Sequence, residues 1–179
     1  MKHIVCIGGG TGSFVVLSGL KKYAAPTAIV SMADSGGSAR KERDEWGLLP
    51  VSDVRKALLA LAEAKNGNTR LGTLRELFNY RFSEGVGVSG MTFGNLLLVA
   101  LTNVLDSQEK AIEEASRLLN VKGQILPVTF DQSNLVVKYS DGTEIVGEHI
   151  LDEFLEKYPE KTSIKVTDFY LLPTPKASP

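Results

Sequence analysis

The segment IVCIGGGTGS, Ile4 to Ser13, decides the fold that this sequence predicts. A short apolar run from His3 to Ile7 stops at glycine, which is typical of a strand buried on both faces. From Ser13 to Tyr23 apolar residues recur with helical spacing, and Ala28 to Ala33 form a second apolar run. Strand, helix and strand within about 30 residues make a βαβ unit. The sequence therefore predicts a parallel sheet with a right-handed crossover.

Helical patterns dominate the middle of the chain. Ser52 is a plausible N-cap for a helix with an apolar stripe from Val54 to Leu61. Gly94 and Asn95 open a segment that is apolar almost all round to Leu105, which predicts a buried helix.

The pattern changes after Gly123. Residues 124–129, 135–139 and 144–148 are each predicted to be strands, and a Ser-Asp-Gly-Thr turn separates the last two. We expect a small β-rich hairpin insertion at 124–148, then a mostly polar helix at 152–157 and a last strand at 164–172.

Composition excludes several classes of protein. With 179 residues, 43% of them hydrophobic, the chain fits one globular domain, and a net charge of −1 argues against a nucleic-acid partner. The single Cys6 and two scattered histidines, His3 and His149, argue against a transition-metal cluster. The apolar run from Leu96 to Leu101 is too short for a membrane span, so we expect a cytoplasmic protein without membrane insertion.

The strongest functional signal is the glycine loop, Gly8-Gly9-Gly10-Thr11-Gly12, between a strand and a helix. Without Cβ atoms the backbone can approach a ligand closely, and a helix N-terminus presents N–H groups to phosphate. The loop is no Walker A motif, and Ser13 replaces the third glycine of the dinucleotide pattern. The alternative is a tight turn without a ligand.

A second loop follows the second strand, and in open parallel sheets such loops line one crevice. Its Asp34 could accept hydrogen bonds from sugar hydroxyls, and its serines could bind a second phosphate. Asp53 and Asn95 each begin a helix, where Asp53 is also favoured by the helix dipole alone. The candidate ligand-binding residues are Gly8, Gly9, Gly10, Thr11, Gly12, Asp34, Ser35, Gly36, Gly37, Ser38, Asp53 and Asn95. We identify no catalytic residue and no metal ligand.

Seven motifs in order along nearly the whole chain resemble the YvcK-like (gluconeogenesis factor) family, which is related to the CofD 2-phospho-L-lactate transferases. They are Ile7–Gly12 (IGGGTG), Met32–Ser38 (MADSGGS), Leu49–Arg55 (LPVSDVR), Asn79–Phe82 (NYRF), Gly94–Leu97 (GNLL), Ile125–Thr129 (ILPVT) and Asp141–Glu148 (DGTEIVGE).

The resemblance implies a Rossmann-like α/β fold, with residues 1–179 as a single domain that corresponds to the N-terminal part of a longer family fold. It implies a cytoplasmic, regulatory protein that binds a nucleotide-sugar such as UDP-glucose or UDP-N-acetylglucosamine, in carbon metabolism, cell-wall synthesis and cell shape. A homo-oligomer stays open, since strands missing from the sheet could leave an edge that pairs with another chain.

Three alternatives stay open beside this one. A CofD-like transferase would move phospholactate onto a deazaflavin alcohol, with magnesium near Asp34. A dehydrogenase would use a nicotinamide cofactor, although the weak match at Ser13 argues against it. A degenerate member would have a protein partner or no ligand.

Overall fold

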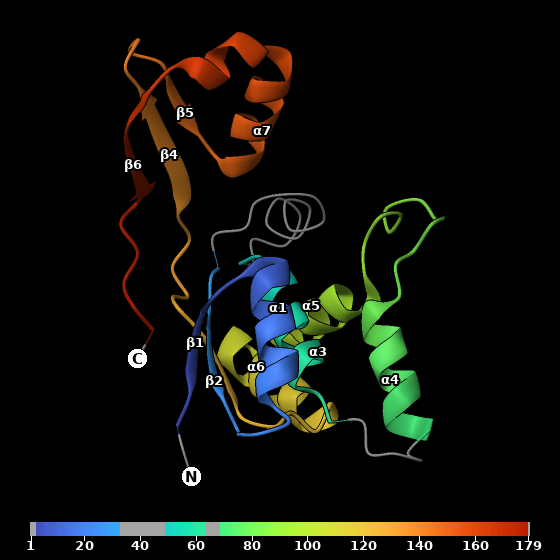
Figure 1. The fold of residues 1–179 in the computed structure, drawn as a ribbon. Coiled ribbons are helices and arrows are strands. Elements are labelled where there is room, and N and C mark those ends of the chain that lie inside the picture. The colour runs from blue at the N-terminus through green and yellow to red at the C-terminus, as the bar shows by residue number, and fades with distance from the viewer. Residues whose placement is uncertain (1–2, 33–48, 64–68, 179) are drawn as a thin grey trace.

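The structure is a computed structural model of the chain, and it describes residues 3–32, 49–63 and 69–178. Its first unit is a parallel sheet, in which β1 (Val5–Gly8) pairs with β2 (Thr27–Val30) and β2 pairs with β3 (Gln124–Pro127). Helices cover this sheet, as Figure 1 shows. The predicted α/β fold with a parallel sheet flanked by helices is confirmed.

The helices of the first unit are α1 (Gly10–Leu20), α3 (Ser52–Leu61), α4 (Thr69–Asn79), α5 (Phe93–Leu105) and α6 (Gln108–Leu118). Helix α3 is central, because it contacts β2 and β3 as well as the other four helices. Its apolar side chains from Val54 to Leu61 are all buried and form the middle of the main hydrophobic core. Contacts with the sheet and with four helices therefore hold α3 in a fixed position.

Strand β3 joins the parallel sheet although it lies within the β-rich segment expected at 124–148. Gly123 makes this possible, because its φ is +112° and a Cβ there would collide with the carbonyl oxygen of Pro26. The Gln124 N–H then donates to that same oxygen across 3.0 Å, and β3 continues alongside β2.

A second, antiparallel unit follows. Strand β4 (Asn134–Tyr139) pairs with β5 (Glu144–Val146) as the expected hairpin, and with β6 (Val166–Leu172) on its other side. Helix α7 (Glu148–Lys157) and a short 3₁₀ helix (Pro159–Ser163) lie between β5 and β6 in the chain. A small core forms where Val137, Tyr139 and Ile145 meet α7.

The C-terminal segment then returns to the first unit (Figure 1). The Ser178 N–H donates to the Val128 carbonyl across 2.9 Å, and the Lys176 N–H donates to the Asp131 carboxylate across 2.7 Å. These bonds tie the last described residues to the segment that follows β3.

Strand β1 is not buried on both faces as the sequence predicts. Val5 is 56% exposed and Ile7 is 76% exposed. Strand β1 lies at the edge of the three-stranded sheet, and Val15 and Val16 of the neighbouring helix α1 are exposed as well. The apolar run predicted the strand correctly, but in the part of the chain that the structure describes it is covered on one side only.

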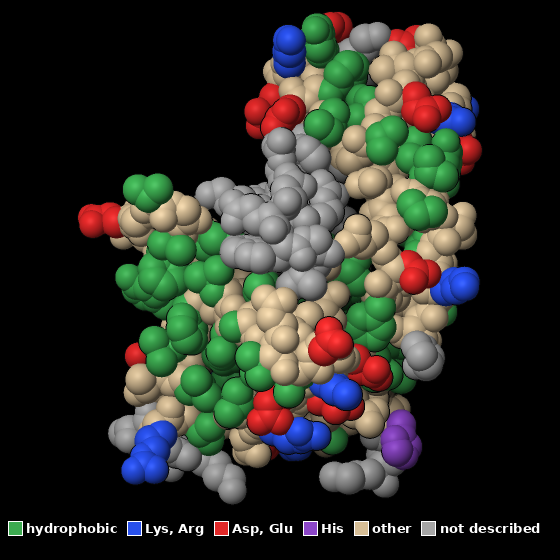
Figure 2. All heavy atoms as spheres, turned by 180° about the vertical axis from the view of Figure 1, so that it is seen from behind, with side chains coloured by type: hydrophobic (Ala, Val, Ile, Leu, Met, Phe, Trp, Pro, Cys, Tyr) green, Lys and Arg blue, Asp and Glu red, His purple; other side chains and the backbone are tan. Residues whose placement is uncertain are grey.

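Charges of both signs are scattered over the face shown in Figure 2, with no extended area of one sign among the described residues. No helix in the described ranges is long and apolar enough to cross a membrane.

Candidate nucleotide-binding loop

The glycine loop joins the end of β1 to the start of α1. Gly9 is extended and is the N-cap of the helix, and it supplies no side-chain hydrogen bond to the first N–H groups. Gly10 follows with φ +69°, in the left-handed region that favours glycine. The helix thus begins three residues earlier than Ser13, where the sequence predicted it, so its first turn lies within the glycine loop.

Space around the loop differs from one glycine to the next. A Cβ on Gly8 would lie 2.6 Å from the Ser13 hydroxyl oxygen, whereas a Cβ on Gly10 or Gly12 would meet no atom of the described residues within 4 Å. As far as the described residues extend, the backbone at Gly10 and Gly12 is therefore open to an approaching ligand. Uncapped N–H groups at a helix N-terminus bind anions well.

Asp53 lies against this loop, although 44 residues separate it from Gly9 in the sequence. A Cβ on Gly9 would collide with the Asp53 carboxylate, so only glycine allows the first turn of α3 to come this close. The side chain of Asp53 is 10% exposed, and its Oδ1 forms an ion pair with Lys56 Nζ across 2.8 Å. The structure thus places a carboxylate and an ammonium beside the N-terminus of α1.

Asn95 also lies near the start of α3, but it is 1% exposed. Its Oδ1 accepts a hydrogen bond from Arg55 Nε across 2.9 Å, and its Nδ2 donates to the Ser52 hydroxyl across 3.4 Å. Arg55 Nη1 also donates to Asn79 Oδ1 across 3.1 Å. The side chain of Asn95 therefore connects α5 to the helix that carries Asp53, and its direct contact with a ligand stays a prediction.

Sequence reasoning gave Arg55 and Lys56 no role at the site. The available signal was their position in the first two turns of the helix that Asp53 begins, since side chains three or four residues apart share one face of a helix. Arg55 is 7% exposed, and a buried guanidinium needs hydrogen-bond acceptors around it. Asn79 and Asn95 supply two of them.

The predicted residues Asp34, Ser35, Gly36, Gly37 and Ser38 lie outside the described residues, so their place beside the glycine loop stays a prediction. In the ranges that the structure describes, no three His, Cys, Asp or Glu side chains gather as a metal site would require.

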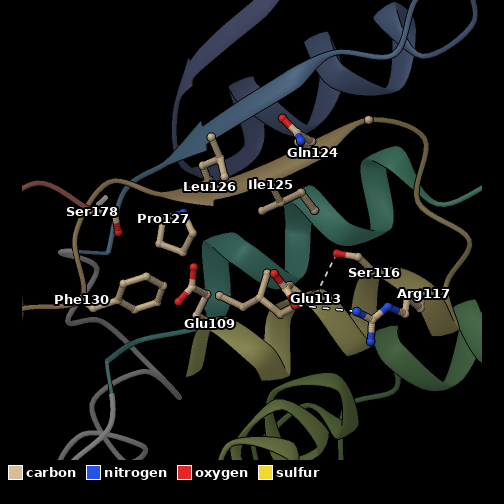
Figure 3. A pocket seen from close by; sticks show the side chains of 12 residues that line it. Glu109, Glu113, Ser116, Arg117, Gln124, Ile125, Leu126, Pro127, Phe130 and Ser178 are labelled. Carbon is tan, nitrogen blue, oxygen red and sulfur yellow. Dashed lines mark hydrogen bonds and ion pairs between the residues drawn. The ribbon is translucent and has the colours of Figure 1, made fainter. Parts of the chain in front are cut away.

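A separate pocket of about 310 Å³ lies at the other edge of the sheet, between β3 and α6 (Figure 3). Its floor is apolar, with Ile112, Ile125 and Phe130, and Glu113 and Arg117 stand at its rim with their charged groups 3.7 Å apart. Strand β2 separates β3 from β1, so this pocket is distinct from the glycine loop.

Comparison with known proteins gives one consistent result. A family model described as 2-phospho-L-lactate transferase CofD matches residues 4–178. A putative gluconeogenesis factor of Nostoc sp. is 45% identical over 146 residues, 81% of this chain and 31% of that protein. A putative gluconeogenesis factor of Aquifex aeolicus is 39% identical over 98% of this chain and 52% of that protein.

The gluconeogenesis factor of Bacillus subtilis is 38% identical over 84% of this chain and 46% of its own length. A crystal structure of a UPF0052 family protein from Bacillus halodurans superimposes on all of this chain with a TM-score of 0.83 and 37% identity. This chain covers 53% of that one. The chain thus spans about half, or less, of the length of the relatives it matches.

Proposed function

The chain belongs to the CofD family, where its relatives are gluconeogenesis factors, and on that premise we propose that it binds a nucleotide-sugar at the glycine loop. The proposed ligand is a UDP-sugar such as UDP-glucose or UDP-N-acetylglucosamine. The proposed role is regulatory, in the cytoplasm, in carbon metabolism, cell-wall synthesis and cell shape. The observation that carries the proposal is the Asp53 carboxylate against Gly9, at the N-terminus of α1.

The diphosphate would lie over Gly10 and Gly12. No described residue occupies the space beside either position, and the N–H groups of the first turn of α1 would donate to phosphate oxygens. The partial positive charge at this helix end adds to the attraction.

Asp53 would accept hydrogen bonds from hydroxyl groups of the ribose or the sugar. A carboxylate and a phosphate about 4 Å apart repel each other, so Asp53 suits the neutral part of the ligand rather than the diphosphate. Its ion pair with Lys56 supports this arrangement, because the ammonium offsets the carboxylate and can itself approach a phosphate. The predicted loop at 34–38 would contact the remainder of the ligand.

The test is isothermal titration calorimetry of the full chain with UDP-glucose, UDP-N-acetylglucosamine, UDP and GDP. We expect binding of a UDP-sugar, weaker binding of UDP, and an unchanged UDP-sugar after long incubation. Well-folded protein that binds none of the four would overturn the proposal.

A CofD-like transferase is the second candidate, favoured by the family description that matches residues 4–178. Such a reaction would use magnesium to neutralise phosphate charge. Among the described residues Asp53 is the carboxylate placed to contribute one ligand, and Lys56 would have to release it. Magnesium-dependent transfer of phospholactate from a nucleotide-activated donor to a deazaflavin alcohol would decide for this candidate.

A further inference from the structure

We infer that the pocket between β3 and α6 binds a small cation that joins an amide group to an apolar ring, as the amide of an aromatic amino acid does. Strand β2 lies between β3 and β1, the strand that leads into the glycine loop. The inference is therefore independent of the proposed nucleotide-sugar site.

The pocket has the size and the walls of a small-molecule site. Its volume of about 310 Å³ lies at the lower end of the range of ligand pockets, which is roughly 300–1,000 Å³. Ile112 of α6 and Ile125 of β3 form an apolar floor, at 3% and 8% exposure. Phe130 lies beside Pro127 at one end (Figure 3). An apolar ring in the pocket can pack against the Phe130 ring.

The outer edge of β3 turns one backbone N–H toward the pocket. The N–H groups of Gln124 and Val128 donate to carbonyl oxygens of the β2 segment across 3.0 and 2.9 Å, so these alternate residues are turned toward β2. Ile125 lies between them, so its N–H and C=O face outward. At the next outward position Pro127 has no N–H, which blunts the edge against an added strand. One donor and one acceptor on the same residue match a single amide group.

Ser178 supplies a second polar group. Its N–H donates to the Val128 carbonyl across 2.9 Å, which holds the C-terminal segment at the end of the pocket. The Ser178 Oγ is buried and has no hydrogen-bond partner among the described residues. A buried hydroxyl without a hydrogen bond costs free energy, and an amide carbonyl in the pocket would accept one from it.

The rim of the pocket selects for positive charge. Glu109, Glu113 and Arg117 follow each other at four-residue intervals on the face of α6 that lines the pocket. Arg117 Nη1 lies 2.7 Å from Glu114 and its Nη2 lies 3.7 Å from Glu113, whereas Glu109 forms no ion pair with a described residue. Because exposed ion pairs add little affinity, these carboxylates favour a cation and repel anions, while the floor and the amide contacts hold the ligand.

Amide NMR spectra of the full chain, titrated with phenylalaninamide at about pH 6 where its amine is protonated, test the inference. We expect a saturable shift of the Ile125 N–H that exceeds the shift of Leu126, whose N–H is turned toward β2. N-acetylphenylalaninamide lacks the positive charge and should bind about threefold more weakly. Phenylalanine, with a carboxylate in place of the amide, should bind at least about tenfold more weakly.

Two neighbouring glutamates provide the matched variants. Glu113→Gln should weaken phenylalaninamide binding about threefold. Glu114→Gln removes the adjacent carboxylate, which pairs with the same Arg117 but does not line the pocket, and should leave binding unchanged. Circular dichroism confirms that both variants fold. No shift at Ile125 with phenylalaninamide would overturn the inference, as would equal binding of the three compounds or equal effects of the two variants.

Discussion

Arg55 Nε donates to Asn95 Oδ1 across 2.9 Å, and this bond joins the first turns of α3 and α5 inside the protein. Both residues are almost fully buried, at 7% and 1% exposure. Asn79 at the end of α4 accepts from the same guanidinium, so three helices meet at Arg55. Because α3 also carries Asp53, this network holds one wall of the candidate site.

Asn95→Ala should destabilise the protein by about 2–3 kcal/mol, because the buried guanidinium of Arg55 loses an acceptor. The free energy of unfolding from urea titration measures this. Asn103→Ala is the matched control, since Asn103 lies exposed on the same helix and should change stability by no more than about 0.5 kcal/mol. Equal effects of the two substitutions would contradict a structural role for the network.

Gly94→Ala should also destabilise, by about 2–3 kcal/mol through overpacking. A Cβ at Gly94 would lie 2.5 Å from the Phe78 carbonyl oxygen and 2.8 Å from Arg55 Cδ. Gly72→Ala in α4 should instead stabilise by about 0.5–1 kcal/mol, because a Cβ there meets nothing within 4 Å and alanine favours helix. Thermal unfolding distinguishes the two, and a Gly94→Ala variant as stable as the parent would refute the close packing of α5 on Arg55.

Gly12→Ala should weaken UDP-sugar binding at least tenfold and yet raise the melting temperature. The added methyl meets no atom of the described residues within 4 Å, so it improves the helix but projects where the diphosphate is proposed. Gly19→Ala is matched to it, as a glycine in the same helix with equally open surroundings. It should raise stability and leave calorimetric affinity unchanged. Unchanged affinity in Gly12→Ala would place the ligand elsewhere.

Asp53→Asn should lower UDP-sugar affinity about tenfold, because a charge-assisted hydrogen bond to a ligand hydroxyl becomes a neutral one. Glu109→Gln removes a carboxylate from the first turn of α6, away from the glycine loop, and should have no effect. Calorimetry compares the two variants. Tighter binding by Asp53→Asn would show instead that Asp53 faces a phosphate, where its charge repels.

Lys21 should lose its proton at a lower pH than Lys138. Burial lowers the pKa of its ammonium, and the charge of Arg75 acts in the same direction. Hydrogen bonding to Tyr170 and Glu144 raises the pKa of Lys138, so Lys138 should keep its proton to a higher pH than Lys21 does. NMR titration of the two lysine side chains gives the order of their pKa values. Titration of Lys21 and Lys138 at the same pH would contradict the two pKa shifts.

The Lys21 shift also predicts how stability depends on pH. Between the lowered pKa of Lys21 in the folded state and its ordinary value of 10.5, the unfolded chain binds more protons at this residue. Stability should therefore rise with pH through that interval, relative to Lys21→Met, which lacks the titrating group. A difference between the two proteins that stays constant with pH would contradict the shift.

The sequence by itself determined β1, α1, β2, α3 and α5 of the first unit, and the glycine loop between β1 and α1. Apolar periodicity placed α3, a continuous apolar run placed α5, and the glycines after Ile7 placed the strand-to-helix turn, because these signals depend on residues close together in the chain. The predicted starts of α3 and α1 were wrong in detail. Val51 rather than Ser52 is the N-cap of α3, and α1 begins at Gly10 rather than at Ser13.

Only the tertiary structure decided which segments meet. The run at Gln124–Pro127 has the same local pattern as the hairpin strands after it, and its pairing with β2 depends on the fit of Gly123 against Pro26. The contact of Asp53 with Gly9, the hydrogen bonds of Arg55 and the outer positions of β1 and β6 in their sheets likewise have no local signature. Each depends on how helices and strands far apart in the chain pack, and that packing is set by the whole core rather than by any one segment.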